Sequence, residues 1–259
     1  MAVKGEPVLQ IIQPDWNAAP HVQAAATCRY GGVSAAGYQS LNLATHVGDD
    51  PGLVSQNRRL LAAALDLPQA PCWIEQVHSP VIVCADDIDA NAHGDVTVTA
   101  DGTWTDRPGV VCAVLTADCL PVLLCDAAGT RVAAVHAGWR GLAAGILGNA
   151  LDVFTGAGIA AGQIRVWLGP AIGPAAYEVD AVVRDAFLKL EPSCQGSFMA
   201  SRPGHWHFSL YAAARAILGA RGVTDISGGA LCTFSEQRFY SYRRDNVCGR
   251  QATLIWIAK

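Results

Sequence analysis

The chain has 259 residues, of which 51% are hydrophobic and 15% are charged, and its formal net charge at pH 7 is −4. A chain of this length and apolar content can bury a large core, which argues against disorder. The small negative charge offers no electrostatic attraction to nucleic acid or to an anionic membrane, so neither is expected as a partner. We expect a single domain over residues 1–259.

The cysteines indicate the compartment in which the protein works. The chain has nine of them, an odd number, and no CxxC pair. The N-terminal segment lacks a basic start followed by an apolar stretch, so we expect no signal peptide. Unpaired thiols without an export signal are typical of the reducing cytosol, and we therefore predict a cytoplasmic protein. The most apolar stretch, residues 110–125, is interrupted by Asp118 and is too short to span a bilayer.

Hydrophobic patterning and turn signals predict alternating strands and helices. In chain order we expect a strand over 24–30, a helix over 53–65, a strand over 72–84 that is broken near 78–80, strands over 110–115, 120–125 and 130–136, a helix over 142–154, a strand over 164–168, helices over 179–190 and 210–218, and strands over 239–242 and 252–257. The alternation is not a regular βαβ repeat. It favours an α/β (mixed α+β) fold with a mixed sheet or two sheets and helices outside, rather than a Rossmann sheet or a barrel. Neither a G-x-G-x-x-G loop nor a Walker loop is present.

The strands over 120–125 and 130–136 flank a turn signal at residues 126–129, which predicts a hairpin. With a two-residue loop, paired positions sum to 255, and Cys119 lies opposite His136. Side chains at directly paired positions have Cβ atoms about 5 Å apart, close enough to share one metal ion. A register shifted by one residue would turn the two side chains to opposite faces of the sheet.

His78 supplies a third soft donor, because it interrupts an apolar stretch within Glu75–His78. One thiolate and two imidazoles suit Zn²⁺, and three protein ligands with an open position describe a catalytic zinc site. The same donors form the ligand set of blue-copper centres, so copper is the alternative metal. A histidine beside an apolar strand is more often a core residue, and spacing alone leaves that alternative open.

Several longer motifs occur in a recognisable order. They are EQVH, TADCLPVLL, HAGWRGL, GPAIGP and FYSYRRD followed by GR, with RYGGVS, SLNLATHVGDD and QNR near the N-terminus. Together they resemble the laccase-domain (YfiH-type, multicopper polyphenol oxidase) family from about residue 27 to about residue 256. The departures are small: residues 101–103 read Asp-Gly-Thr where an Ala-Asp-Ala-like stretch is usual, and Tyr177 stands where Phe is common.

The resemblance implies a single α/β domain with mixed β-sheets packed between helices. It also implies that His78, Cys119 and His136 bind zinc and form the catalytic centre of a purine nucleoside enzyme. Members of the family are described as phosphorolysing adenosine, inosine, guanosine and methylthioadenosine and as deaminating adenosine. The expected partners are thus a purine nucleoside and phosphate, and we expect a monomer or a weak homo-oligomer.

Three further residues are candidates for substrate binding. Arg140 and the backbone N–H groups at the strand-to-helix turn are suited to phosphate, whereas a surface or structural pair is the alternative for Arg140. Arg58 and Asn42 are candidates for ribose or phosphate contacts. For Arg243 and Arg244 a structural ion pair with Asp245 is the favoured interpretation, and for Asp118 a structural role beside the ligands.

Other functions remain open at this point. A copper-dependent, laccase-like polyphenol oxidase with a three-copper cluster requires more imidazoles than the seven histidines of this chain. Cys119 with His136 as its base would instead give a cysteine-dependent hydrolase. An enzyme that edits peptidoglycan precursors and a non-catalytic binding module are the remaining alternatives.

Overall fold

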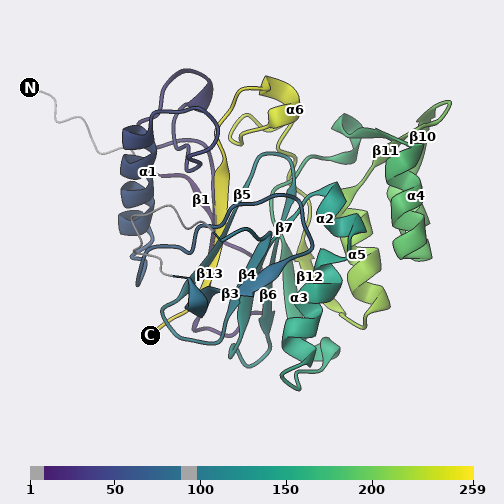
Figure 1. Ribbon diagram of the computed structural model, residues 1–259, viewed down its shortest axis with the longest axis horizontal. Coiled ribbons are helices and arrows are strands. Elements are labelled where there is room, and N and C mark those ends of the chain that lie inside the picture. The colour runs from purple at the N-terminus through teal and green to yellow at the C-terminus, as the bar shows by residue number, and fades with distance from the viewer. Residues whose placement is uncertain (1–8, 89–97) are drawn as a thin grey trace, which may run out of the picture.

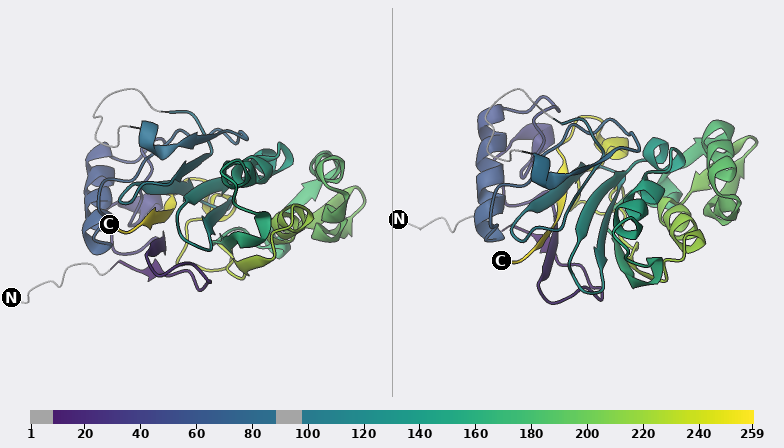
Figure 2. Two further views of the ribbon diagram at one scale, coloured as in Figure 1. Left: turned by 90° about the horizontal axis from the view of Figure 1, so that it is seen from below. Right: turned by 60° about the horizontal axis from the view of Figure 1, so that its bottom comes forward.

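The computed structural model describes residues 9–88 and 98–259. Two β-sheets pack face to face, and helices cover the outer face of each, as Figures 1 and 2 show. A third, small sheet lies at one end of the molecule with helix α4. This arrangement confirms the predicted mixed α/β class with sheets between helices.

The first sheet has four strands in the order β1–β2–β13–β5, and all three pairings are antiparallel. The strands are β1 Ile11–Ile12, β2 Val22–Thr27, β5 Val111–Thr116 and β13 Gln251–Ile257. Helix α1, Pro51–Ala64, covers the outer face through buried residues such as Leu61, which packs with Ala113 and Leu254. Asp50 caps this helix, because its carboxylate accepts from the backbone N–H groups of its first turn.

The second sheet has six strands in the order β12–β8–β6–β7–β4–β3. The strands are β3 Ile82–Cys84, β4 Gly102–Thr105, β6 Leu120–Asp126, β7 Val132–Ala137, β8 Ile164–Leu168 and β12 Asp225–Gly228. Both β6 and β7 are fully buried along their length, as expected for strands covered on both faces. Leu123 and Ala134 face the first sheet, whereas Val122 and Val135 pack toward the helices on the other side.

Helices α3 and α5 cover the outer face of this second sheet, and α4 packs beyond them with the third sheet. The helices are α2 Trp139–Ala143, α3 Ile146–Thr155, α4 Ala181–Leu190, α5 Leu210–Ala220 and α6 Tyr242–Asp245. The third sheet contains β9 Glu178–Asp180, β10 Phe198–Arg202 and β11 His205–Phe208. Short 3₁₀ turns lie at Ala36–Tyr38, Ala85–Asp87, Ala161–Gln163, Pro174–Ala176 and Pro192–Ser197.

The hairpin of β6 and β7 forms, but its predicted register is wrong. Pro121, not Cys119, pairs with His136, so paired positions sum to 257. The loop is longer than predicted because the Asp126 carboxylate accepts hydrogen bonds from the backbone of Thr130 and Arg131. A shift of two residues preserves the alternation of faces, and Cys119 and His136 therefore stay on the same side of the hairpin.

Three other predicted elements need correction. The helix over 142–154 is two helices, because Gly145 adopts a left-handed φ of 93° between α2 and α3. The strand over 72–84 is a strand only at Ile82–Cys84, and residues 72 and 75 form isolated bridges. Residues 239–242 are not a strand. The Tyr240 amide bonds to the Gln251 side chain, and Ser241 caps the short helix α6.

Within the described residues, no helix combines the length and the apolar character needed to cross a membrane.

Candidate metal centre and substrate pocket

Three predicted ligands meet at one end of the β6–β7 hairpin. His78 lies in the loop before β3, Cys119 immediately precedes β6, and His136 is in β7. Their donor atoms all lie within 4.8 Å of one another, and His78 Nε2 is 3.7 Å from Cys119 Sγ. The structure thus brings together the residues that the sequence grouped. Among the residues that the structure describes, this is the single cluster with such ligand geometry.

Asp101 orients both histidines, and the sequence did not single it out as a site residue. Its carboxylate is 2.8 Å from His136 Nδ1 and accepts from the backbone N–H groups of His78, at 2.9 Å, and Ser79, at 2.6 Å. It is fully buried at the residue before β4. Because the Asp101 carboxylate accepts a hydrogen bond from the protonated Nδ1 of His136, the Nε2 lone pair is left for a ligand. The available signal was an acid beside an apolar strand.

Backbone geometry around the three ligands is unusual in two places. His78 has a φ of 63°, in the left-handed region, and the Asp101 carboxylate holds it there by accepting from its own backbone N–H and from those of Val77 and Ser79 on either side. At Gly138 a Cβ atom would lie 2.6 Å from His78 Cδ2 and 3.0 Å from Cys119 Sγ. Glycine is therefore required where the chain leaves β7, since any larger residue would displace a ligand.

The ligands shift one another's protonation. Burial raises the pKa of the Cys119 thiol, but the adjacent His136 and His78 outweigh it and lower this pKa to about 6. Burial lowers the pKa of His136, but Cys119 and Asp101 outweigh it and raise this pKa to about 9. For Asp101, hydrogen bonds from His136 and Ser79 outweigh burial and lower the pKa to about 2. The arrangement therefore favours a thiolate at Cys119, which is the form that binds a metal ion.

A cavity of about 160 Å³ opens beside Cys119. Three aromatic side chains line it, Trp139, Tyr177 and Tyr242, together with Arg243. A second hollow of about 370 Å³ adjoins it and shares Trp139, Tyr177 and Arg243 as walls. The candidate metal centre thus borders an aromatic pocket that is open to solvent on its far side.

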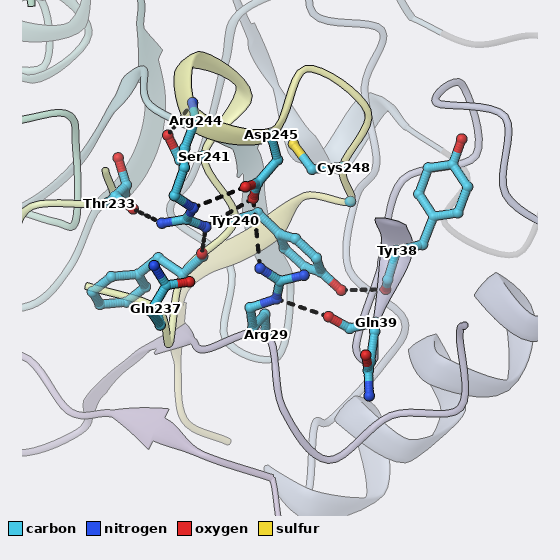
Figure 3. A network of polar contacts seen from close by, with 12 residues as sticks. Arg29, Tyr38, Gln39, Thr233, Gln237, Tyr240, Ser241, Arg244, Asp245 and Cys248 are labelled. Atoms are coloured by element: carbon cyan, nitrogen blue, oxygen red, sulfur yellow. Dashed lines mark hydrogen bonds and ion pairs between the residues drawn. The ribbon is translucent and has the colours of Figure 1, made fainter. Parts of the chain in front are cut away.

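Arg243 and Arg244 differ in role although they are neighbours. Arg244 is paired with Asp245, as predicted, and donates to backbone carbonyls in the network of Figure 3, in which Arg29 also bonds to Asp245. Arg243 makes no ion pair within the described ranges, so for it the prediction is wrong. Its guanidinium lies 5.2 Å from the centroid of the Tyr177 ring, at the pocket wall.

Asp118 joins the ligand loop to this wall. One carboxylate oxygen accepts from Thr233 Oγ1 at 2.6 Å, and the other accepts from the backbone N–H of Arg243 at 2.7 Å. The residue has a φ of 94°, which an aspartate adopts only when the surroundings hold it there. Asp118 therefore fixes the position of α6 relative to Cys119, in line with the structural role expected for it.

Arg140 lies on the same side of the molecule as the pocket. It is exposed, and its guanidinium stacks 4.5 Å from the centroid of the Trp139 ring. Burial raises the pKa of Tyr177 and Cys119 adds to the rise, whereas Arg243 and Arg140 oppose it. Arg140 thus adjoins a wall residue of the pocket, Trp139, and is not itself among the residues that line the two cavities.

Arg58 and Asn42 lie together, outside the aromatic pocket. The Arg58 Nε donates to the carbonyl of Leu43 at 3.0 Å, and its guanidinium stacks 4.3 Å from the centroid of the Trp73 ring. Asn42 is fully buried, and its side chain bonds to Asp49 and to the backbone of residues 44 and 250. No surface of Asn42 is left for a direct contact with substrate.

The fold and this cluster define an α/β protein of two helix-covered sheets with a candidate metal centre at a hairpin end. The chain belongs to the multi-copper polyphenol oxidoreductase laccase family, whose model matches residues 23–258.

Similar proteins cover almost the whole chain. A purine nucleoside phosphorylase of Pseudomonas aeruginosa is 48% identical, with 95% of this chain and 98% of that protein aligned. The purine nucleoside phosphorylase YfiH of Escherichia coli is 43% identical, with 96% and 99% aligned. The crystal structure of a Neisseria meningitidis protein superimposes with a TM-score of 0.90 at 44% identity, covering 96% of this chain and 99% of that one. YlmD of Geobacillus stearothermophilus gives a TM-score of 0.86 at 34% identity, covering 93% and 94%.

Proposed function

We propose that this protein is a zinc-dependent purine nucleoside phosphorylase. The observation that carries the proposal is the Cys119 thiol, which belongs to a three-ligand cluster and at the same time lines an aromatic pocket. Relatives that are 43% and 48% identical over nearly their whole length are named purine nucleoside phosphorylases. Inosine, adenosine, guanosine and methylthioadenosine are the proposed substrates.

The donor set fits a zinc ion. His78 and His136 offer imidazole nitrogens and Cys119 a thiolate sulfur, all within the span of one coordination sphere. The Asp101 carboxylate behind His136 is the partner that metal-bound histidines generally have. Copper is the second candidate ion, because the same donors suit it. When bound, the ion supplies a Lewis acid at the base of the pocket.

The pocket walls are suited to a purine. Trp139, Tyr177 and Tyr242 present ring faces and edges on which a flat heterocycle packs. Arg243 at the wall and Arg140 beside Trp139 place two positive charges near the pocket, where the ribose of the nucleoside is proposed to lie. Asn42 acts at a distance, by holding the segment that carries Arg250.

In the proposed reaction a phosphate oxygen forms a bond to the ribose C1′ while the bond from C1′ to the purine nitrogen breaks. The electron pair of the broken bond leaves with the purine, which takes up a proton, and the products are the free base and ribose 1-phosphate. The aromatic walls hold the leaving base and exclude water from it. Asp101 keeps a proton on His136 Nδ1 and so fixes the direction in which Nε2 points.

Deamination of adenosine at the same centre is proposed as a second activity. It requires attack of water on the purine ring beside the ligand cluster, and the partly exposed His78 and Cys119 leave that side of the cluster open. The proposal predicts release of inosine and ammonia from adenosine in the absence of phosphate.

The proposed function is tested with Cys119→Ala and with Cys84→Ala as the matched control. Cys84 is also a partly exposed thiol, but it lies on β3 outside the pocket. We expect Cys119→Ala to lose the bound zinc and at least about 100-fold in kcat/KM for inosine, because the ion's only thiolate ligand is removed. Zinc content and hypoxanthine release are measured on both variants. Full activity of metal-free protein that is abolished by thiol alkylation would favour the cysteine-dependent hydrolase.

We further propose that the protein works in the cytoplasm as a single domain. All nine cysteines are unpaired thiols in the structure. Such a set is typical of a reducing compartment.

A further inference from the structure

A group of basic side chains adjoins the aromatic pocket and takes no part in the chemistry described above. Arg58 comes from α1, His46 from the loop before it, and Arg250 from the residue that precedes β13. The Arg250 guanidinium lies 5.9 Å from the centroid of the Tyr242 ring, which is a wall of the pocket beside Cys119. Both arginines act on His46: burial, then Arg250 and then Arg58 lower the pKa of this histidine. The segments that carry Arg250 and Arg58 both bond to Leu43, three residues before His46: Leu43 N–H donates to the Arg250 carbonyl at 3.3 Å, and Arg58 Nε donates to the Leu43 carbonyl at 3.0 Å.

Arg58 is half-buried and has no acidic partner. It takes part in none of the ion pairs found in residues 9–88 and 98–259. One of its nitrogens, Nε, donates to Leu43, and the flat face of the group rests on Trp73. Burial without a counter-ion lowers the pKa of Arg58 to about 10. Within the described residues the two terminal nitrogens of Arg58 have no hydrogen-bond partner, so they remain available for another acceptor.

Arg250, like Arg58, is a half-buried arginine without an acidic partner in the described chain. It is half-buried, and it too is absent from the ion pairs of the described chain. Its Nη1 donates to the carbonyls of Cys248 and Gly249, at 2.9 and 3.0 Å. These are neutral acceptors, so the charge itself is not compensated. Glu75 is the one acid that acts on His46, and its carboxylate already accepts from Thr99.

The positions of these groups are fixed by a buried asparagine. Asn42 Oδ1 accepts from the Arg250 backbone N–H at 3.0 Å, and the Asn42 carbonyl accepts from Asn57 on α1 at 2.9 Å. Arg58 bonds to the carbonyl of the next residue, Leu43. The site is therefore pre-organised, because the segments that carry its charges are bonded to one another without any ligand.

Two half-buried guanidinium groups without counter-ions are unfavourable on their own, because each has lost hydration. An oxyanion with several acceptor oxygens offsets this cost, and a fork of N–H donors matches it. We infer that Arg58, Arg250 and His46 form a binding site for a phosphate group. The identification of this group as the phosphate co-substrate rests on the proposed function.

The direct test is calorimetric titration of the zinc-loaded protein with inorganic phosphate, without nucleoside, so that no reaction is needed. We expect Arg58→Gln and Arg250→Gln each to weaken phosphate binding at least about tenfold. Arg59→Gln is the matched control, since it removes the same charge from the neighbouring, exposed position of α1 and should change binding by less than about threefold. Unchanged affinity in both site variants overturns the inference, as does a loss confined to Arg140→Gln.

The variant Arg58→Lys tests whether a loss of phosphate binding merely reflects misfolding. It keeps the positive charge but replaces the planar guanidinium by a single ammonium group. We expect it to bind phosphate with an affinity between those of the unmodified protein and Arg58→Gln, at an unchanged unfolding temperature. Wild-type affinity in a folded Arg58→Lys together with wild-type affinity in Arg250→Gln would count against the site.

Two further measurements are made, binding of inosine 5′-monophosphate and cleavage of inosine. The first distinguishes a nucleotide phosphate from free phosphate, and the second distinguishes failure of the site from failure of the proposed function. If inosine 5′-monophosphate binds more tightly than inorganic phosphate and both site variants abolish that binding, the group belongs to a nucleotide, and the co-substrate assignment is overturned. If phosphate binds at the site but inosine is not cleaved, the proposed function fails and the site stands. If inosine is cleaved with an unchanged phosphate KM in both variants, the site fails and the function stands.

Discussion

The two sides of the pocket are built in different ways. On the ligand side, His78, Cys119 and His136 come from one hairpin and one preceding loop, and a buried carboxylate orients them. On the opposite side, Tyr242 and Arg243 belong to a four-residue helix that is held by long-range contacts, including the bond from the Arg243 backbone N–H to Asp118 across 125 positions of the chain. The positions of the metal-binding side chains are therefore set by the hairpin and the loop beside it. The positions of the pocket walls that contact a substrate are set by tertiary packing.

The largest effect expected on the ligand side is in thiol reactivity. In metal-free protein the pKa of Cys119 is about 6, against an ordinary value of 9.0, because the two histidines favour the thiolate. At pH 7 its thiolate fraction should therefore exceed that of an ordinary thiol by roughly 100-fold. Alkylation of Cys119 by iodoacetamide should stay fast from pH 8 down to pH 7 and fall as the pH drops through about 6. Mass spectrometry of the alkylated peptides measures this.

Cys84 serves as the internal control, because it is a partly exposed thiol whose pKa is raised by burial. A Cys119 alkylation rate that falls already below pH 9, in step with an ordinary thiol, would contradict the described contacts with His78 and His136.

A smaller effect is expected on replacing the residue behind the ligands. Asp101→Asn substitutes an N–H donor where the carboxylate accepts from His136, His78 and Ser79, so one donor must face another. We expect zinc affinity to fall about 10- to 100-fold, which a competing chelator measures. Asp106→Asn, at an acid paired with Arg131 on the surface, should leave the affinity unchanged. Equal zinc affinity in the two variants would show that Asp101 does not orient the histidine ligands.

The smallest effect is expected on the wall side. Arg244→Gln breaks the bonds to Asp245 and Thr233 that Figure 3 shows, and also the bond to the carbonyl of Phe239. We expect KM for inosine to rise about 3- to 10-fold, because Tyr242 and Arg243 lose their fixed position, while zinc affinity is unchanged. Steady-state kinetics and chelator competition report the two quantities separately. Loss of zinc in this variant would show that the two sides are not independent.

The same contrast explains what the sequence predicted. Cys119 and His136 could be placed together because strand alternation preserves faces, and an error of two residues in register did no harm. Helices α1, α3, α4 and α5 and strands β2, β5, β6, β7, β8 and β13 followed from hydrophobic periodicity, whereas β1, β4, β9, β10, β11 and β12 were not predicted. The family motifs extended from about residue 27 to about residue 256.

The wall of the pocket could not be predicted in this way. The tyrosine-rich segment around Tyr240 has the composition of a strand, but its backbone is bonded to the Gln251 side chain and its end is capped by Ser241. Arg243 and Arg244 are adjacent and chemically alike, and their different roles arise from contacts with Tyr177 and Asp245 that no local pattern encodes. In the sequence Asp101 was visible as an acid beside an apolar strand and as part of a departure from the usual motif, but its role was not, because its bonds to the loop of His78 span 22 residues or more.

The central claim is that the ligand cluster and the aromatic pocket together cleave purine nucleosides with phosphate. The most direct measurement is quantification of ribose 1-phosphate, free ribose and hypoxanthine after incubation of the zinc-loaded protein with inosine, with and without phosphate. We expect ribose 1-phosphate and hypoxanthine to form in equimolar amounts, and only when phosphate is present. Release of free ribose at the same rate without phosphate, or no release of hypoxanthine at all, would contradict it.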